Sequence, residues 1–218
     1  MPKKSDATCS ECGLVSCYRR EKDFPPFCLT ESSDPAELGK VLDLYKGDGE
    51  DARVSRAAAE VEGIYYGKLT RIEEIIAFAN RIEAKRIGIA TCIGLIEETR
   101  VFVKILEAHG LESYTVLCKV GSVDKTEVGI PEELKILKGS HESLCNPIFQ
   151  ARIFNAQKTD LNVIVGLCVG HDSLFIKHSD ALVTTLITKD RVLAHNPAAA
   201  LYTAGFYYKR LLLPEKKL

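Results

Sequence analysis

The chain has 218 residues, of which 46% are hydrophobic and 27% are charged, as expected for a globular protein with one well-packed domain and a small appendage. Its formal net charge of −1 gives no basic field for nucleic acid, and no apolar stretch reaches the roughly 18 residues of a membrane span. No apolar run follows the lysines near the N-terminus, so no secretory signal is expected. We therefore expect a cytoplasmic protein that binds neither nucleic acid nor membranes.

The eight cysteines fall into two groups of four. The first group lies close to the N-terminus and comprises Cys9, Cys12, Cys17 and Cys28. The second group is spread through the later part of the chain and comprises Cys92, Cys118, Cys145 and Cys168. Because cytoplasmic thiols stay reduced, so many cysteines indicate metal or redox chemistry more than structural disulfides.

Residues 1–33 are predicted to form a small metal-binding knuckle. The cysteine spacing is Cys9-x2-Cys12-x4-Cys17-x10-Cys28, and Gly13 follows the second cysteine. A tight turn of this kind directs two sulfurs to the same side, and four thiolates complete a tetrahedral site for Zn²⁺. Four closely spaced cysteines also suit a [4Fe–4S] cluster, so zinc and iron–sulfur both remain open.

Residues 34–84 are predicted to be helical. Asp34 followed by Pro35 indicates a helix start, and this helix runs to about residue 46. A second helix covers roughly residues 50–66 by its apolar period. A third begins at Thr70, which forms a capping box with Glu73.

From residue 85 onward, short apolar strands alternate with helices. Strands are predicted at 86–90, 113–118, 162–166 and 181–188, and helices at 96–108, 146–158 and 172–178. This alternation predicts a Rossmann-like or flavodoxin-like α/β fold, a mostly parallel sheet with helices on both faces. A fifth strand at 191–194 is expected to form an antiparallel edge hairpin with the fourth, and a last helix to run from Asn196 to about residue 212. The layout is then a knuckle over 1–33 and one α/β domain over 34–218, helical at 34–84 and Rossmann-like at 85–218.

The four later cysteines are predicted to share one edge of this sheet. Ligands of open parallel sheets bind beyond the carboxyl ends of the strands. Cys92 and Cys168 each follow a strand, Cys118 ends one, and Cys145 precedes the helix cap Asn146. Such a site suits a [4Fe–4S] cluster, a redox dithiol pair or a nucleophilic cysteine. The alternative is that these residues are small buried hydrophobes, as Cys118 in its apolar run would be.

Several polar residues accompany this edge. His171 and Asp172 form either a general acid–base pair or an exposed histidine beside a helix-capping aspartate. Lys119 is either an anion ligand or, as is more common, a solvated lysine. His195 is expected to serve packing, and a loop with His141 and Ser143 lines the edge if it folds inward. No dinucleotide-binding or phosphate-loop glycine motif is present, so a nucleotide cofactor is not expected.

Three segments together with the N-terminal cysteines resemble the DUF1847 family of uncharacterised bacterial and archaeal proteins. They are Leu144–Ala151, Gly166–Phe175 and Lys189–Pro197. Members of this family are often labelled metal-binding, so the resemblance implies bound metal but no particular reaction.

The sequence thus predicts a metal-binding protein with a structural knuckle and a second cysteine site. That second site would make it an iron–sulfur or thiol-based redox or sulfur-handling enzyme acting on a small molecule, served by a redox partner protein. The alternative is a non-enzymatic metal or redox sensor, or a metallochaperone. The sequence does not set the oligomeric state.

Overall fold

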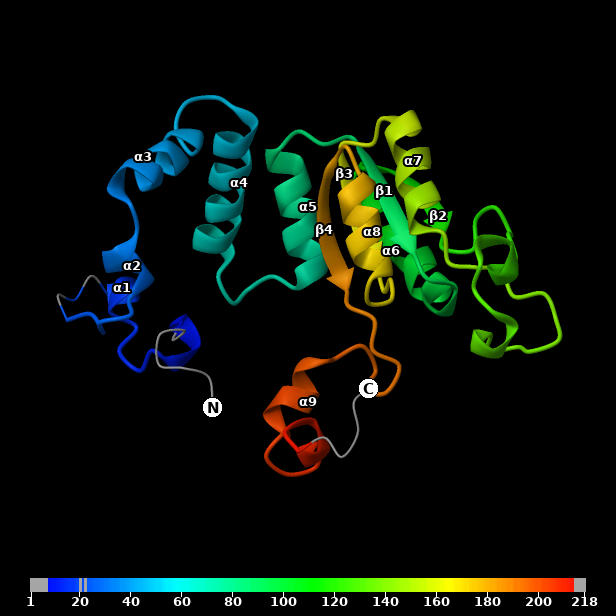
Figure 1. Cartoon of the computed structure of the whole chain (residues 1–218). Helices are drawn as coiled ribbons and strands as arrows, with labels where there is room; N and C mark the ends of the chain where they lie inside the picture. Colours follow the sequence, from blue (N-terminus) through cyan, green and yellow to red (C-terminus); the bar gives the residue numbers. More distant parts are fainter. Residues whose placement is uncertain (1–7, 20, 22, 214–218) are drawn as a thin grey trace. The chain divides into compact units, whose positions relative to one another are not determined.

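A computed structural model describes residues 8–19, 21 and 23–213 of the chain (Figure 1). The chain divides into two compact units, Met1–Glu60 and Val61–Leu218. Within the described residues, no helix is both long and apolar enough to cross a membrane.

The first unit consists of short helices. They are the 3-10 turn Cys9–Glu11, α1 (Ser16–Arg19), α2 (Leu29–Ser32), α3 (Pro35–Leu44) and most of α4 (Glu50–Tyr65). Asp34 caps α3 as predicted, since its Oδ1 accepts from the amide of Ala36 at 2.9 Å, and Pro35 occupies the first turn.

The second unit contains a four-stranded sheet in which all pairs are parallel. Its strands are β1 (Arg86–Thr91), β2 (Glu112–Leu117), β3 (Leu161–Val165) and β4 (Leu182–Ile187), in the order β2-β1-β3-β4. The two central strands β1 and β3 are almost entirely buried, which is why they are continuously apolar and not alternating. The predicted parallel α/β fold is confirmed.

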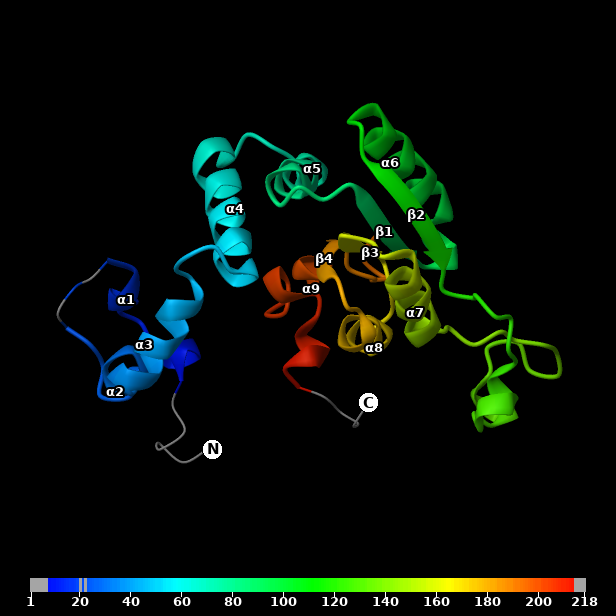
Figure 2. The ribbon, with the colours of Figure 1, turned by 90° about the horizontal axis from the view of Figure 1, so that it is seen from above.

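Helices cover both faces of the sheet (Figure 2). On one face α5 (Arg71–Arg81) and α6 (Ile96–Ala108) pack on Ile87 and Ile89 of β1. On the other, α7 (Pro147–Gln157) and α8 (His171–His178) pack on Ala90 of β1 through Phe154 and Phe175. The two faces of β1 therefore bury two separate apolar clusters, as the alternation of side chains along a strand requires.

The segment after β4 differs from the prediction, because residues 191–195 form a turn instead of a fifth strand. Asp190 Oδ1 accepts from the amides of Val192 and Leu193, both at 2.8 Å, and His195 Nδ1 accepts from the amide of Asp190 at 3.1 Å. These bonds use the amides that a hairpin would need. The packing role of His195 is thus to close this turn, and the predicted edge hairpin is wrong.

The last helix is also shorter than predicted. It is reduced to α9 (Ala198–Tyr202), and a 3-10 turn follows at Lys209–Leu211.

Candidate functional site

Backbone hydrogen bonds bring three of the later cysteines together beyond the carboxyl ends of the strands. The amide of Cys92 donates to the last residue of β3, Val165, at 3.1 Å, and the amide of Cys118 donates to the last residue of β1, Thr91, at 2.8 Å. The amide of Asn146 donates to the Cys118 carbonyl at 2.7 Å, which fixes Cys145 beside them. We call the edge that carries Cys92, Cys118, Cys145 and Cys168 the rim.

The rim includes the point where the chain reverses its winding. From β1 the chain crosses to β2 through α6 on one face, and from β3 it crosses to β4 through α8 on the other (Figure 2). The loops after β1 and β3 therefore diverge, and a parallel sheet binds its ligands at such a place. Cys92 lies in the first of these loops and Cys168 in the second.

The thiol of Cys118 lies between those of Cys92 and Cys145 and interacts with both. Cys118 is 2% exposed and Cys92 is 7% exposed, whereas Cys145 is half-buried. The Cys118 sulfur also accepts from the amide of Ile93 at 3.4 Å. Cys118 is thus buried, as the packing alternative expected, but it also contacts two other thiols.

Basic side chains lie against the sulfurs of the rim. Lys119 Nζ lies 3.3 Å from the Cys145 sulfur, and Arg191 Nη2 lies 2.8 Å from that of Cys168. The Lys189 ammonium lies close enough to the Cys92 thiol to interact with its charge. A Cβ on Gly94 would lie 3.2 Å from Lys189 Nζ, so a glycine at this position leaves room for the ammonium group.

These contacts set the protonation of the thiols. The hydrogen bond from Cys118 and the ammonium of Lys189 lower the pKa of Cys92 to about 5 against the cost of burial. The hydrogen bond from Cys118, the ammonium of Lys119 and the charge of His171 likewise lower the pKa of Cys145 to about 5. The pKa of Cys118 is raised, because its proton serves both neighbours. Because Cys118 has one proton to donate, it can stabilise the thiolate of Cys92 or that of Cys145 at any moment, and the ionisation of each depends on the other.

The predicted acid–base residues have different surroundings. His171 begins α8 and is half-buried. Its charge lowers the pKa of Cys145. Asp172 does not cap α8: the amides of His171 and Asp172 both donate to the Cys168 carbonyl, and the Asp172 carboxylate accepts from the amide of Ser173 at 2.8 Å. The capping alternative for Asp172 is therefore wrong, and its acid–base role stays a prediction.

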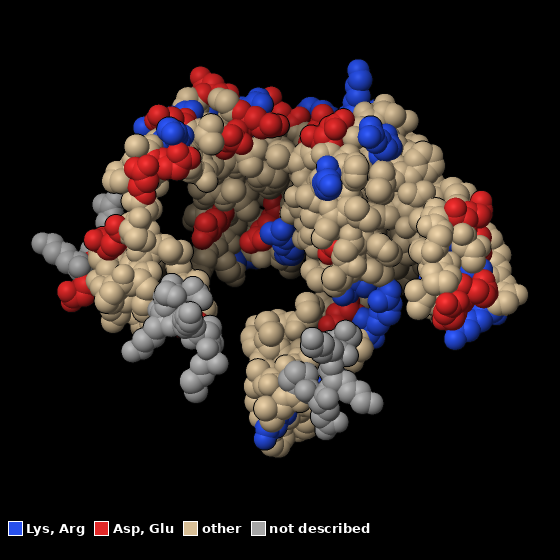
Figure 3. Space-filling view, viewed as in Figure 1, with Lys and Arg blue, Asp and Glu red and all other residues tan. Residues whose placement is uncertain are grey.

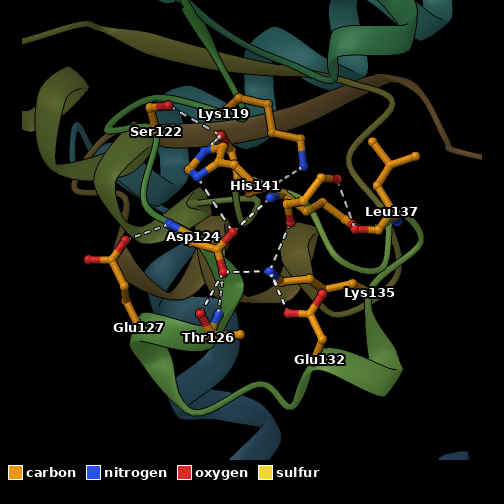
Figure 4. A network of polar contacts seen from close by, with 12 residues as sticks. Lys119, Ser122, Asp124, Thr126, Glu127, Glu132, Lys135, Leu137 and His141 are labelled. Carbon is orange, nitrogen blue, oxygen red and sulfur yellow. Dashed lines mark hydrogen bonds and ion pairs between the residues drawn. The ribbon is translucent and has the colours of Figure 1, made fainter.

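Residues 119–145 approach the rim through Lys119 (Figure 4). Its Nζ donates to the Ser143 carbonyl at 2.6 Å as well as contacting Cys145. The Ser143 hydroxyl lies 2.9 Å from His141 Nε2, and His141 Nδ1 lies 3.5 Å from Asp124 Oδ2. His141 and Ser143 thus support the lysine, and no bond from either side chain to a sulfur is present among the described residues.

Buried ion pairs hold this connection in place (Figure 4). Lys135, whose side chain is 5% exposed, lies between Asp124 at 2.9 Å and Glu132 at 2.8 Å. Hydrogen bonds from Thr126 and Lys135 lower the pKa of Asp124, and the Lys125 ammonium and backbone amides lower that of Glu142 to about 2. Residues 119–145 contain only two short helical elements, the 3-10 turns Lys125–Val128 and Glu132–Leu134. The segment is therefore held mainly by these polar contacts.

The N-terminal cysteines adopt local turns. The amide of Cys12 donates to the Cys9 carbonyl at 3.2 Å, and the amide of Glu31 lowers the pKa of Cys28 where α2 begins. In neither cysteine group, nor elsewhere in the described part of the chain, are three or more cysteine, histidine, aspartate or glutamate residues arranged to hold a metal ion. Thiols are suitable donors for zinc and iron, and both metal predictions stay predictions.

Sequence reasoning missed Lys189 and Arg191 at the rim. Both directly follow β4, whose carboxyl end lies at the same edge as those of the other strands, and this position is the signal that would have found them. On the face that Figure 3 shows, acidic and basic side chains both occur, so surface charge there does not single out these two residues.

Comparisons with known proteins agree with the resemblance in the sequence. The model of a family described as "Protein of unknown function (DUF1847)" matches residues 28–186, which include all four rim cysteines. The uncharacterized protein MJ0455 of Methanocaldococcus jannaschii is 47% identical over 204 residues, 94% of this chain and 97% of that protein. No solved structure matches. The chain therefore belongs to the DUF1847 family.

Proposed function

We propose that the rim is the centre of a thiol-based redox enzyme that acts on a small disulfide or persulfide. The observation that carries the proposal is the chain of three thiols, Cys92, Cys118 and Cys145, flanked by lysines. A thiolate is the reactive form of cysteine, and neighbouring cations and hydrogen bonds stabilise it near neutral pH.

Exposure assigns different tasks to the thiols. Cys145 is half-buried and is paired with Lys119, so it is the accessible nucleophile, whereas Cys118 is buried and protonated beside it. The Cys145 thiolate attacks one sulfur of a disulfide substrate, which forms a mixed disulfide and releases the other half of the substrate as a thiolate. His171 is close enough to lower the pKa of Cys145 through its charge, and it can supply a proton to this leaving group.

The second step releases the half of the substrate that is bound to Cys145. Cys118 gives up its proton and attacks the Cys145 sulfur, so that a Cys118–Cys145 disulfide forms and the second half of the substrate leaves as a thiol. In total two cysteine thiols are oxidised to a disulfide, and one substrate disulfide is reduced to two thiols. A thiol reductant, such as a redox partner protein, restores the cysteines by the same exchange.

The sulfur contacts favour this chemistry over a [4Fe–4S] cluster at the rim. The cysteines of such a cluster bind four separate irons and must stand apart, whereas the Cys118 thiol interacts directly with those of Cys92 and Cys145. For the first unit we propose that Cys9, Cys12, Cys17 and Cys28 hold Zn²⁺ or a [4Fe–4S] cluster, on the strength of their spacing. No step at the rim depends on that site.

The test is to treat the reduced full-length protein with a small neutral disulfide and to map the products by mass spectrometry. A Cys118–Cys145 disulfide and two released thiols per protein are expected. Cys118→Ser should stop at the mixed disulfide on Cys145, and Cys17→Ser, altered in the first unit, should react as the unaltered protein does.

Failure to react, or reaction spread evenly over all eight cysteines, would contradict the enzyme. Anaerobic purification with metal analysis and optical and EPR spectra tests the metal sites in parallel. An iron–sulfur spectrum lost on substitution of the rim cysteines would favour the cluster in place of free thiols. Tight metal binding at the rim without turnover would favour the sensor or metallochaperone.

A further inference from the structure

Three cations from separate places in the second unit converge on the rim. Lys119 follows β2, and Lys189 and Arg191 follow β4. Among the described residues, none of the three forms an ion pair with a carboxylate. The acidic neighbour of two of them, Asp190, uses a carboxylate oxygen to accept from two backbone amides. Each of these cations instead lies against a sulfur atom, that of Cys145, Cys92 or Cys168, and Lys119 also donates to the Ser143 carbonyl.

Sulfur is a partner whose charge depends on its oxidation state. A cysteine thiolate carries a full negative charge, whereas each sulfur of a disulfide is neutral. When Cys145 and Cys118 form a disulfide by reducing a substrate disulfide, Lys119 loses its anionic partner. Lys119 is half-buried, and charges at such a site attract each other more strongly than in bulk water.

We propose that the rim is an oxyanion-binding site that opens when its thiols are oxidised, with Lys119, Lys189 and Arg191 as the ligands of a small phosphate, sulfate or carboxylate group. This inference rests on the proposed thiol chemistry. The guanidinium of Arg191 is exposed and offers a planar pair of donors that suits an oxyanion, and the two ammonium groups supply charge. In the reduced protein the Cys145 thiolate competes with an added anion for Lys119, so the anion binds weakly.

The expected gain in anion affinity on oxidation comes from the release of one cation, Lys119, from the Cys145 thiolate. A hydrogen bond to a charged group contributes about 1.5–3 kcal/mol, which corresponds to a gain of roughly 10- to 100-fold in affinity. Binding and oxidation are linked, so an anion that prefers the oxidised protein tenfold lowers the reduction potential of the dithiol by about 30 mV.

The experiment measures binding of inorganic phosphate and of sulfate by calorimetry to the reduced and the oxidised full-length protein at constant ionic strength. Mass spectrometry first establishes the disulfide. We expect at least about tenfold tighter binding after oxidation. Lys119→Gln should abolish this gain, and Arg191→Gln, whose partner Cys168 is not oxidised, should weaken binding to both the reduced and the oxidised protein. Lys177→Gln, at an exposed position on α8, should keep the gain.

One variant tests the charge argument without any oxidant. Cys145→Ser removes the thiolate permanently, so under reducing conditions it should bind phosphate as tightly as the oxidised protein does. Equal binding to the reduced and oxidised protein, or an unchanged gain in Lys119→Gln, would overturn the oxyanion site alone. If no disulfide forms, the thiol chemistry fails and the redox dependence falls with it. Weak binding to Cys145→Ser also overturns the site.

Discussion

Replacing Cys118 by alanine should raise the pKa of its neighbouring thiols. The hydrogen bond from Cys118 is the largest cause of the low pKa, about 5, of Cys92 and of Cys145. A hydrogen bond to a charged group contributes about 1.5–3 kcal/mol, and 1.36 kcal/mol corresponds to one pKa unit. Loss of the bond should therefore raise the pKa of the more acidic thiol by about 1 to 2.

The assay is the rate of alkylation at each cysteine as a function of pH, resolved by peptide mass spectrometry. A thiol with a pKa of about 5 is roughly 90% thiolate at pH 6, and one with a pKa of about 6.5 is roughly 25% thiolate. Alkylation of Cys145 at pH 6 should therefore fall about fourfold in Cys118→Ala. Cys118→Ser keeps a donor and should retain most of the rate. An unchanged pH profile in the alanine variant would refute the hydrogen-bonded chain of thiols.

Three further predictions concern the scaffold. Gly88→Ala places a Cβ 2.1 Å from the buried Asn162 Oδ1 and should cost about 1–3 kcal/mol in urea unfolding, whereas Gly63→Ala, with no atom within 4 Å, should be neutral or stabilising. Gln150→Leu removes a buried side chain that donates to the carbonyls of two strands, and it should cost about 1–3 kcal/mol by the same measurement. Because the pKa of Glu142 is lowered to about 2, its pairing with Lys125 stabilises the 119–145 connection above pH 4.5. The protection of amides there against exchange, relative to an unfolded chain, should fall as pH falls from 4.5 toward 2, and Glu142→Gln should make this fall smaller.

Local patterns accounted for the elements that depend on neighbours in the chain. Apolar runs identified all four strands, and caps such as Thr70 and Asn146 marked the starts of α5 and α7. The fifth strand was predicted wrongly, because Asp190 and His195 close a turn that apolar periodicity does not reveal.

The sequence by itself determined a parallel α/β sheet and cysteines at its carboxyl edge, because strand content and strand ends are local properties. Only the tertiary structure decided the order β2-β1-β3-β4, and with it the place between β1 and β3 where the chain reverses. It also decided that Cys118 stands between two other thiols, and that Lys189 and Arg191 reach sulfurs across the sheet. These contacts join residues distant in the chain, and their distances depend on which strands pair and on which face each helix returns.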